Sequence, residues 1–270
     1  AVAAVAVAFR LGTRTALAAT LAFLAVATSF AVHLDIRTAA RLRAELPADL
    51  TWVDDAAPGR VTAIATESQP SGGLREHLYW NTSIDREVVL AGAVATDQFN
   101  APPLRIGEDG ALLDVPGAFL FDGASTTALF SGARRLAHEP GFSLWEPAGL
   151  VRFRALVVHR YPDGWLAGRG TIRAWPPAGP DAVRVAFTLS LPRRRTKTVR
   201  LAVGGQEFTV HPGEQVPIAC RSGSGPLSLR YSTLDVVVDK RLRFLSARLS
   251  RLAVADAPPT GRGARCSRGV

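Results

Sequence analysis

Two short aromatic clusters are the residues whose types and spacing come nearest to a chemical function. The clusters YWN (79–81) and YPDGW (161–165) each place aromatic rings beside an Asn or Asp side chain. A sugar stacks its C–H face on Tyr or Trp, while Asp and Asn exchange hydrogen bonds with its hydroxyls. The candidate carbohydrate-binding residues are therefore Trp80, Asn81, Tyr161, Asp163 and Trp165.

The same clusters also fit purely structural roles. The order Pro162-Asp163-Gly164 is a strong turn signal, and Tyr161 and Trp165 would then cover the core beneath that turn. Asn81 begins an Asn-Thr-Ser glycosylation sequon, a three-residue pattern that also arises by chance. The sequence leaves the binding role and the structural role of these residues open.

Other catalytic and metal-binding patterns are missing from the sequence. The 5 histidines form no HxxxH or HExxH pair, and the 2 cysteines are not spaced as CxxC. The chain contains neither GxGxxG nor a P-loop pattern, and the nearest approach to GxSxG lies in RSGSGP (221–226), which reads as a turn. We therefore expect no metal and no cofactor in this chain.

The chain is basic, and its positive charge is concentrated after residue 180. Lys and Arg number 32 against 23 Asp and Glu, a net charge of +9, and only Lys197 and Lys240 are lysines. A solvated basic face is the simpler reading, and contact with anionic lipid or an acidic glycan is the other. No recognition motif for nucleic acid accompanies the charge, so we expect no nucleic-acid partner.

The apolar run TALAATLAFLAVATSFAVHL (15–34) contains no Asp, Glu, Lys or Arg. At about 1.5 Å per residue, it matches a hydrocarbon core of about 30 Å. We expect a transmembrane helix continuing as a juxtamembrane helix over 15–46, with residues 1–9 as the end of a preceding span and 10–14 as a short cytoplasmic loop. A buried helix and a cleaved signal peptide are the alternatives.

Two domains are expected after this segment. Residues 47–147 mix short β-rich runs with helical stretches, which predicts a small α/β domain. Residues 148–254 repeat alternating runs such as AVRVAFTLSL and KTVRLAVGG, which predicts an antiparallel β-sandwich of jelly-roll type. Residues 255–270 are rich in Pro, Gly and Arg and predict a disordered tail. Cys220 and Cys266 either form a disulfide outside the cytoplasm or stay apart, with Cys266 in that tail.

The order of these segments resembles the C-terminal region of actinobacterial membrane glycosyltransferases, similar to the dolichyl-phosphate-mannose protein mannosyltransferases. The resemblance rests on the apolar helix followed by LPADLTWVDDAAPGRVTAIAT, LYWNTSIDREVVLAG, EDGALLDVPGAFLF, FSLWEPAGLVRF and YPDGW, and covers about residues 10–255. It implies a GT-C enzyme that transfers sugar from a polyprenyl-phosphate-linked donor on the extracytoplasmic face of the cell membrane. Ala1 rather than Met begins the chain, so we expect it to be processed or cut from a longer protein.

The resemblance places the catalytic acidic residue of such enzymes upstream of this chain, and no position here matches its motif. The chain would then hold the glycan or glycosyl acceptor with an extracytoplasmic module similar to a carbohydrate-binding module. Its other partners would be membrane lipid and, through the missing part, the polyprenyl-phosphate-sugar donor. The alternative is a non-enzymatic, membrane-anchored glycan-binding protein of the cell envelope.

Overall fold

The structure is a computed structural model, and it divides the chain into two compact units, 1–48 and 49–270. It describes residues 20–33, 36, 49–66, 72–90, 101–123, 126–161, 163–176, 182–194, 197–233, 235, 237–238, 244–258 and 264–269. Most of these residues lie in β-strands, which confirms the expectation of a β-rich chain.

The first unit contains a helix over residues 20–33. Its large apolar side chains are exposed, and they are Leu21, Phe23, Leu24, Val26, Phe30 and Val32. Among the described residues, however, no helix reaches the length and hydropathy needed to cross a membrane. The remainder of the expected span and the segments 1–9 and 10–14 lie outside the described residues.

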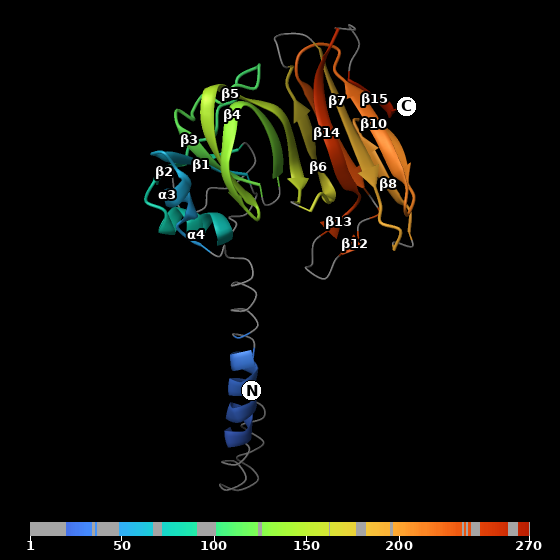
Figure 1. Ribbon diagram of the computed structural model, residues 1–270. Coiled ribbons are helices and arrows are strands. Elements are labelled where there is room, and N and C mark those ends of the chain that lie inside the picture. Colours follow the sequence, from blue (N-terminus) through green and yellow to red (C-terminus); the bar gives the residue numbers. More distant parts are fainter. Residues whose placement is uncertain are drawn as a thin grey trace. The chain divides into compact units, whose positions relative to one another are not determined.

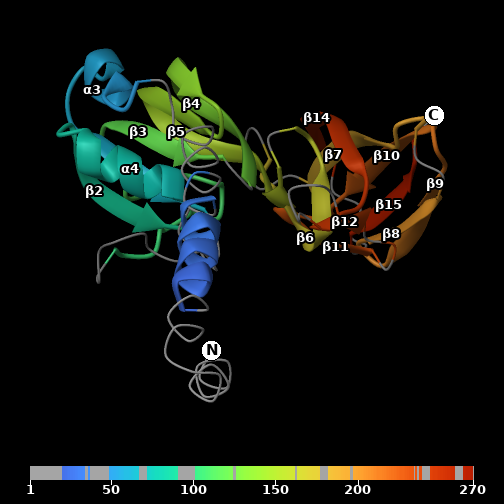
Figure 2. The same ribbon diagram turned by 90° about the horizontal axis from the view of Figure 1, so that it is seen from below.

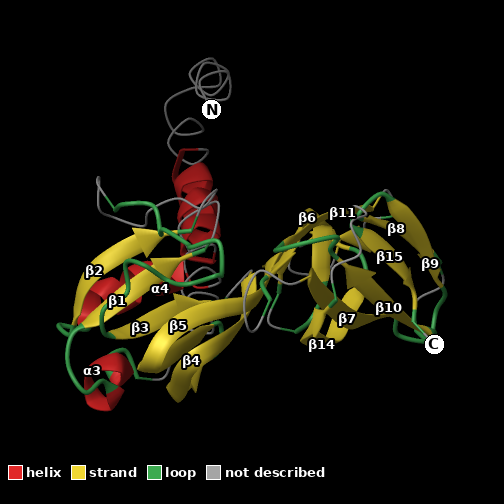
Figure 3. Cartoon of the chain, turned by 90° about the horizontal axis from the view of Figure 1, so that it is seen from above, coloured by secondary structure: helices red, strands yellow, loops and turns green. Residues whose placement is uncertain are grey.

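The second unit begins with a parallel β-arrangement and two short helices. The helices α3 (Trp52–Ala56) and α4 (Gly72–Trp80) accompany β1 (Val61–Ala65), β2 (Ile84–Val89) and β3 (Ala118–Asp122), as Figures 1 and 3 show. β1 pairs in parallel with both β2 and β3. All five residues of β1 are buried, as expected for a central parallel strand with both faces covered.

The longest strand of the chain joins the two domains that the sequence predicts. β4 (Thr126–Glu139) and β5 (Phe142–Arg160) form a hairpin around Pro140 and Gly141. The first residues of β5 pair with β3, and its last residues pair with β6 (Leu166–Ala174). The expected boundary between 147 and 148 is therefore wrong, because one uninterrupted strand crosses it.

A β-sandwich follows, as the alternating runs predict. One layer continues from β5 through β6 to β11 (Leu227–Thr233), β8 (Val199–Val203) and β9 (Gln206–Val210). The other layer has the order β14 (Arg248–Ala257), β7 (Ala182–Ser190), β10 (Gln215–Arg221) and β15 (Arg265–Arg268). The short strands β12 (Val237–Val238) and β13 (Phe244–Leu245) form a separate two-stranded sheet, and Leu245 packs into the sandwich core. Figure 2 shows β7, β10 and β14 in one layer and β6, β8 and β11 in the other.

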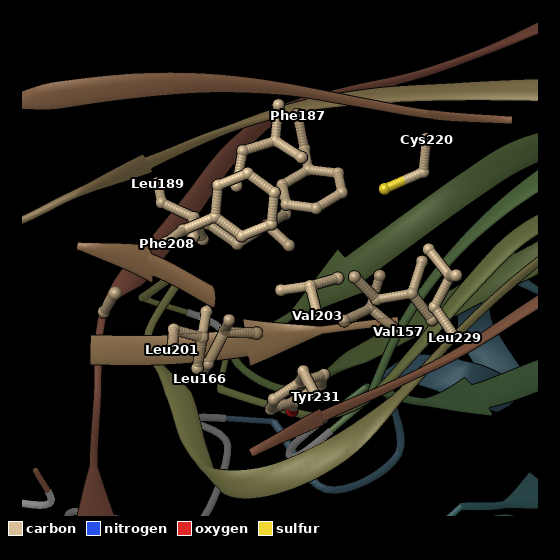
Figure 4. Close-up of a cluster of buried hydrophobic side chains, with 14 of the residues drawn as sticks. Val157, Leu166, Phe187, Leu189, Leu201, Val203, Phe208, Cys220, Leu229 and Tyr231 are labelled. Carbon is tan, nitrogen blue, oxygen red and sulfur yellow. The ribbon is translucent and has the colours of Figure 1, made fainter. Parts of the chain in front are cut away.

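Side chains from both layers interdigitate between them (Figure 4). Phe187, Leu189 and Cys220 come from the β7–β10 layer. Val157, Leu201 and Val203 come from the facing layer, and all six are at most 2% exposed. Alternation along each strand therefore sends one face to this core and the other outward, as in other β-sandwiches.

The prediction of a disordered tail over 255–270 is wrong for the residues described there. β14 extends to Ala257, and β15 pairs antiparallel with β10. Cys266 lies directly opposite Cys220 in that pairing, and the two form a disulfide. The disulfide and the backbone hydrogen bonds of β15 hold the segment Arg265–Arg268 in place, although it contains few apolar side chains that could be buried.

We expect this disulfide to stabilise the sandwich. It closes a loop of 46 residues, for which the chain-entropy relation gives about 4 kcal/mol as an upper value. Cys266→Ser should therefore move the urea unfolding midpoint to lower concentration, whereas Ser267→Ala, on the same strand with an exposed side chain, should leave it nearly unchanged. If reduced and oxidised protein unfold at the same urea concentration, the bridge does not stabilise the fold.

A buried histidine gives the second unit a specific pH dependence. His77 of α4 is fully buried against the rings of Trp52 and Phe142, and neither ring nitrogen has a hydrogen-bond partner among the described residues. Burial lowers the pKa of His77 from 6.5 to about 4. The unfolded chain binds a proton at His77 more readily than the folded chain does. His77 therefore does not affect the free energy of unfolding above about pH 6.5, and it lowers that free energy as the pH falls toward 4.

The loss should reach roughly 3 kcal/mol over that interval. Urea unfolding from pH 7 to pH 4 measures it, and His77→Phe should flatten this part of the profile because an apolar ring does not titrate. The matched control is His138→Gln, which removes an exposed histidine of β4. An equal flattening in both variants would assign the slope to histidines in general rather than to the buried one.

Candidate functional site

A pocket lies where the turn after β5 meets β6 and β11. Its volume is about 470 Å³, within the range of roughly 300–1,000 Å³ that small-molecule sites occupy. The lining residues are His159, Tyr161, Ala167, Gly168, Arg169, Ser232 and Thr233. One tyrosine ring and four polar side chains therefore share a single concave surface.

The pocket owes its shape to an irregularity at the end of β5. The register between β5 and β6 shifts between Val158 and Arg160, and His159 has a φ of 62°. A left-handed backbone is uncommon for a residue with a side chain, and it costs energy that neighbouring contacts must offset. The Nδ1 atom of His159 lies 3.0 Å from the Arg169 carbonyl oxygen, which fixes the imidazole over the pocket rim.

Tyr231 supports this irregular segment from the core side. Its hydroxyl lies 2.8 Å from the carbonyl oxygens of both Val158 and His159 and donates its proton to this pair. Burial raises the pKa of Tyr231, so the hydroxyl remains a donor at every physiological pH. The ring passes directly over Gly170, where a Cβ atom would overlap the Tyr231 hydroxyl and the Val158 carbonyl oxygen.

Arg160 anchors the beginning of the YPDGW turn on β14. Its guanidinium donates a hydrogen bond of 3.0 Å to the Leu249 carbonyl and another to the Thr127 hydroxyl. Burial of this guanidinium lowers the pKa of Arg160. Tyr161 and Trp165 then close the turn through backbone hydrogen bonds, with Gly164 at a φ of 87°.

The structure brings only Tyr161, of the three candidates in YPDGW, into the pocket lining. Trp165 is 8% exposed and packs in the sandwich core, beneath the guanidinium of Arg248 at 5.8 Å from the ring centroid. Asp163 is exposed, but it does not line the pocket, and its backbone carbonyl accepts from Arg248. The expectation that Trp165 offers a stacking platform is therefore wrong, because the ring is buried in the sandwich core and Arg248 lies over it.

Asn81 of the first cluster is also a structural residue. It is 2% exposed, its Oδ1 accepts from the amides of Val53 and Asp54, and its Nδ2 donates to the carbonyls of Leu50 and His77. These four bonds use the amide fully and join α3 to the end of α4. Neither sugar binding nor glycosylation at Asn81 fits such a buried position.

Trp80 lies close to Asn81 in sequence but has a different environment. It is 47% exposed, its Nε1 donates to Glu76, and its ring stands edge-on to Tyr79 at a centroid distance of 5.1 Å. Tyr79 is 76% exposed. This aromatic pair on α4 is a second surface on which a sugar could stack.

Four polar residues of the pocket belong to no motif in the sequence: His159, Arg169, Ser232 and Thr233. They come from three strands, and Arg169 and Ser232 are neighbours only through the pairing of β6 with β11. The spacing of these four residues along the chain does not predict that they meet in one pocket. Within the described residues, no group of three or more His, Cys, Asp or Glu side chains is placed to hold a metal ion.

No family model, curated protein or solved structure matches this chain. The chemistry of the site must therefore be judged from its own residues. A flat tyrosine ring offers stacking area, Arg169 offers donors, and the Ser232 hydroxyl can both donate and accept. The Nδ1 atom of His159 faces a carbonyl oxygen and therefore carries the hydrogen, which leaves Nε2 of the neutral ring as an acceptor. The Thr233 hydroxyl already donates to the Arg200 carbonyl and accepts from the Asp235 amide. This combination is suited to binding a polyhydroxylated ligand.

We expect Gly170→Ala to destabilise the fold, because the added methyl group must displace Tyr231 or Val158. Overpacking of this kind costs about 1–3 kcal/mol. Gly149→Ala is the matched control, since a Cβ atom at Gly149 of β5 meets nothing within 4 Å. Urea unfolding of both variants measures the difference. Equal midpoints would show that Tyr231 is not held against this glycine.

Proposed function

We propose that this chain is the extracytoplasmic C-terminal part of a polyprenyl-phosphate-sugar-dependent membrane glycosyltransferase, and that it binds the glycan or glycosyl acceptor. The pocket at Tyr161 is the observation that carries the binding role. Catalysis is assigned to none of the described residues. In proteins that the chain resembles, the catalytic acid lies in a part that precedes this region.

The lining supports a sugar ligand on three grounds. Tyr161 presents an aromatic ring, on which the C–H face of a sugar can stack. Arg169 supplies hydrogen-bond donors, His159 supplies its Nε2 atom as an acceptor, and Ser232 supplies a hydroxyl that adapts to either role. The volume of about 470 Å³ accommodates one or two sugar rings rather than a long chain.

Two further features support the extracytoplasmic membrane location within this proposal. The Cys220–Cys266 disulfide is of a kind that forms and persists in oxidising compartments outside the cytoplasm. The helix over 20–33 exposes Leu21, Phe23 and Phe30, apolar side chains that favour a lipid environment over water. Membrane lipid is then the partner of the first unit, and glycan is the partner of the second.

The test is glycan binding by the full chain in detergent, measured by calorimetry with a neutral mannan and an acidic uronic-acid polymer. Tyr161→Ala should weaken binding about tenfold, which corresponds to about 1.4 kcal/mol of lost stacking. The unfolding midpoint is measured alongside, because Tyr161 is partly buried and packs against the sandwich core. Arg169→Gln should weaken the acidic polymer more than the mannan.

Tyr79→Ala is the control, as it removes an exposed tyrosine of α4 far from the pocket residues in sequence. If Tyr79→Ala weakens binding and Tyr161→Ala does not, the α4 aromatic pair is the glycan surface and the pocket assignment fails. If neither polymer binds the wild-type chain, the glycan-binding proposal itself fails.

A further inference from the structure

Three arginines lie in one row across the sheet formed by β14, β7, β10 and β15. Arg221 of β10 lies directly opposite Arg184 of β7 on one side and directly opposite Arg265 of β15 on the other. Residues directly opposite in antiparallel strands point to the same face of the sheet. The row therefore aligns three guanidinium-bearing side chains over about 10 Å, or two strand spacings.

The row lies on the solvent side of this layer. The residues next to the arginines along each strand are Val185, Cys220 and Cys266, and all three are buried in the core. Because side chains alternate along a strand, the arginines point outward. Arg184 and Arg265 are exposed, and Arg221 is half-buried.

Like charges placed directly opposite each other destabilise a sheet, so the row needs an explanation. None of the ion pairs in the described part of the chain involves these arginines. On the other side of Arg184, β14 places Ala255 opposite it, and an alanine adds no negative charge. Arg221 donates to the Pro258 carbonyl, while its buried Nε has no hydrogen-bond partner among the described residues.

A hollow adjoins the row, with a volume of about 420 Å³. The next outward-facing positions are small: Ala219 pairs with Ala186 and with Ser267. Gln206, at the start of β9, adds an amide to the lining, and Ser267 adds a hydroxyl. The described lining residues thus combine three positive charges with neutral hydrogen-bonding groups and include no carboxylate.

The neighbouring disulfide holds part of this arrangement in place. Cys220 and Cys266 adjoin Arg221 and Arg265 in sequence and are joined covalently. The two strands that carry these arginines are therefore held in register before any ligand arrives. Such preorganisation reduces the ordering cost of binding.

We propose that this arginine row binds an anion with at least two adjacent phosphate groups, a pyrophosphate or a longer oligophosphate. Arginine forks match phosphate oxygens in pairs of parallel hydrogen bonds, and neighbouring guanidiniums engage neighbouring phosphates. A bound polyanion also removes the repulsion between the three side chains. The site is separate from the glycan pocket and does not rest on the proposed function.

The experiment titrates the full oxidised chain with sodium pyrophosphate, by calorimetry and by thermal unfolding at low salt. Pyrophosphate should bind at least tenfold more tightly than inorganic phosphate and should raise the unfolding temperature. The double variant Arg184→Gln/Arg265→Gln should lose at least tenfold in affinity, and both positions are exposed, so the fold should survive. Arg221→Gln should lose as much, provided that its unfolding temperature without ligand matches the wild-type value.

Arg134→Gln is the control, because it removes one positive charge from β4 at an exposed ion pair with Glu146. Pyrophosphate binding in this variant should equal that of the wild type. Vesicles containing farnesyl pyrophosphate, compared with phosphatidylglycerol vesicles, show whether a lipid-linked source of the same group is accepted. Binding of farnesyl pyrophosphate vesicles together with free pyrophosphate supports a lipid-linked ligand, and binding of free pyrophosphate alone supports a soluble one.

Three results would overturn the proposal. One is the absence of any pyrophosphate-dependent change in heat or unfolding temperature. Another is an equal loss of affinity in Arg134→Gln, which would reveal only a general charge effect. The third is tighter binding of a single-stranded oligonucleotide than of pyrophosphate with the same dependence on the row, which would point to nucleic acid instead.

Discussion

The backbone ladder of β5 is the interaction on which the second unit depends. This strand of 19 residues pairs with β4 along most of its length, with β3 near its beginning and with β6 near its end. Shifting its register by one residue would exchange its faces along the whole length, turning Val157 out of the sandwich core and Leu144 out of the α/β core. Each half of the unit therefore constrains the register of the other.

That constraint accounts for the strained residue at the candidate site. β5 must satisfy two cores, and its regular pairing with β6 stops at Val158, where His159 takes up a left-handed conformation. The carbonyl groups exposed by the irregularity are not left unpaired, because the Tyr231 hydroxyl reaches them from the core. The outward side of the same irregularity forms the pocket, so its concavity follows from the way the sheet ends rather than from a flexible loop.

Local patterns in the sequence predicted the parts of this fold that depend on local physics. Val183, Val185, Phe187 and Leu189 alternate along β7 and identify its inner face correctly, because a half-buried strand needs only period-two burial. The turn between Tyr161 and Trp165 also follows from residue preferences, and backbone hydrogen bonds between these two residues close it. The sequence allows either a binding role or a buried structural role for Trp165, and the structure shows that it is buried.

Features fixed by distant partners could not be predicted in this way. The tail RCSR has no hydrophobic alternation, and it becomes β15 only because β10 offers a free edge and a cysteine at the matching position. Asn81 is of a residue type that often binds ligands, yet its side-chain oxygen accepts hydrogen bonds from the backbone of α3, a segment almost thirty residues earlier. The arginine row likewise arises from register alone, since its members are 37 and 44 positions apart along the chain and meet only through the pairing of β7, β10 and β15.

The two proposed sites lie on the outward faces of opposite layers, separated by one continuous core. Arg169 and Ser232 belong to the β6–β11 layer, and Arg184 and Arg221 belong to the β7–β10 layer. The side chains between them, such as Val185, Leu201 and Val203, are fully buried and tightly interleaved. A packed core resists gradual deformation, so a ligand on one face has no evident means of altering the other. Outward-facing residues of a sandwich do not have to pack in its core, so its opposite faces can present different chemistry. One face of this sandwich carries aromatic and hydroxyl groups, and the other carries a row of positive charge that forms no ion pair among the described residues.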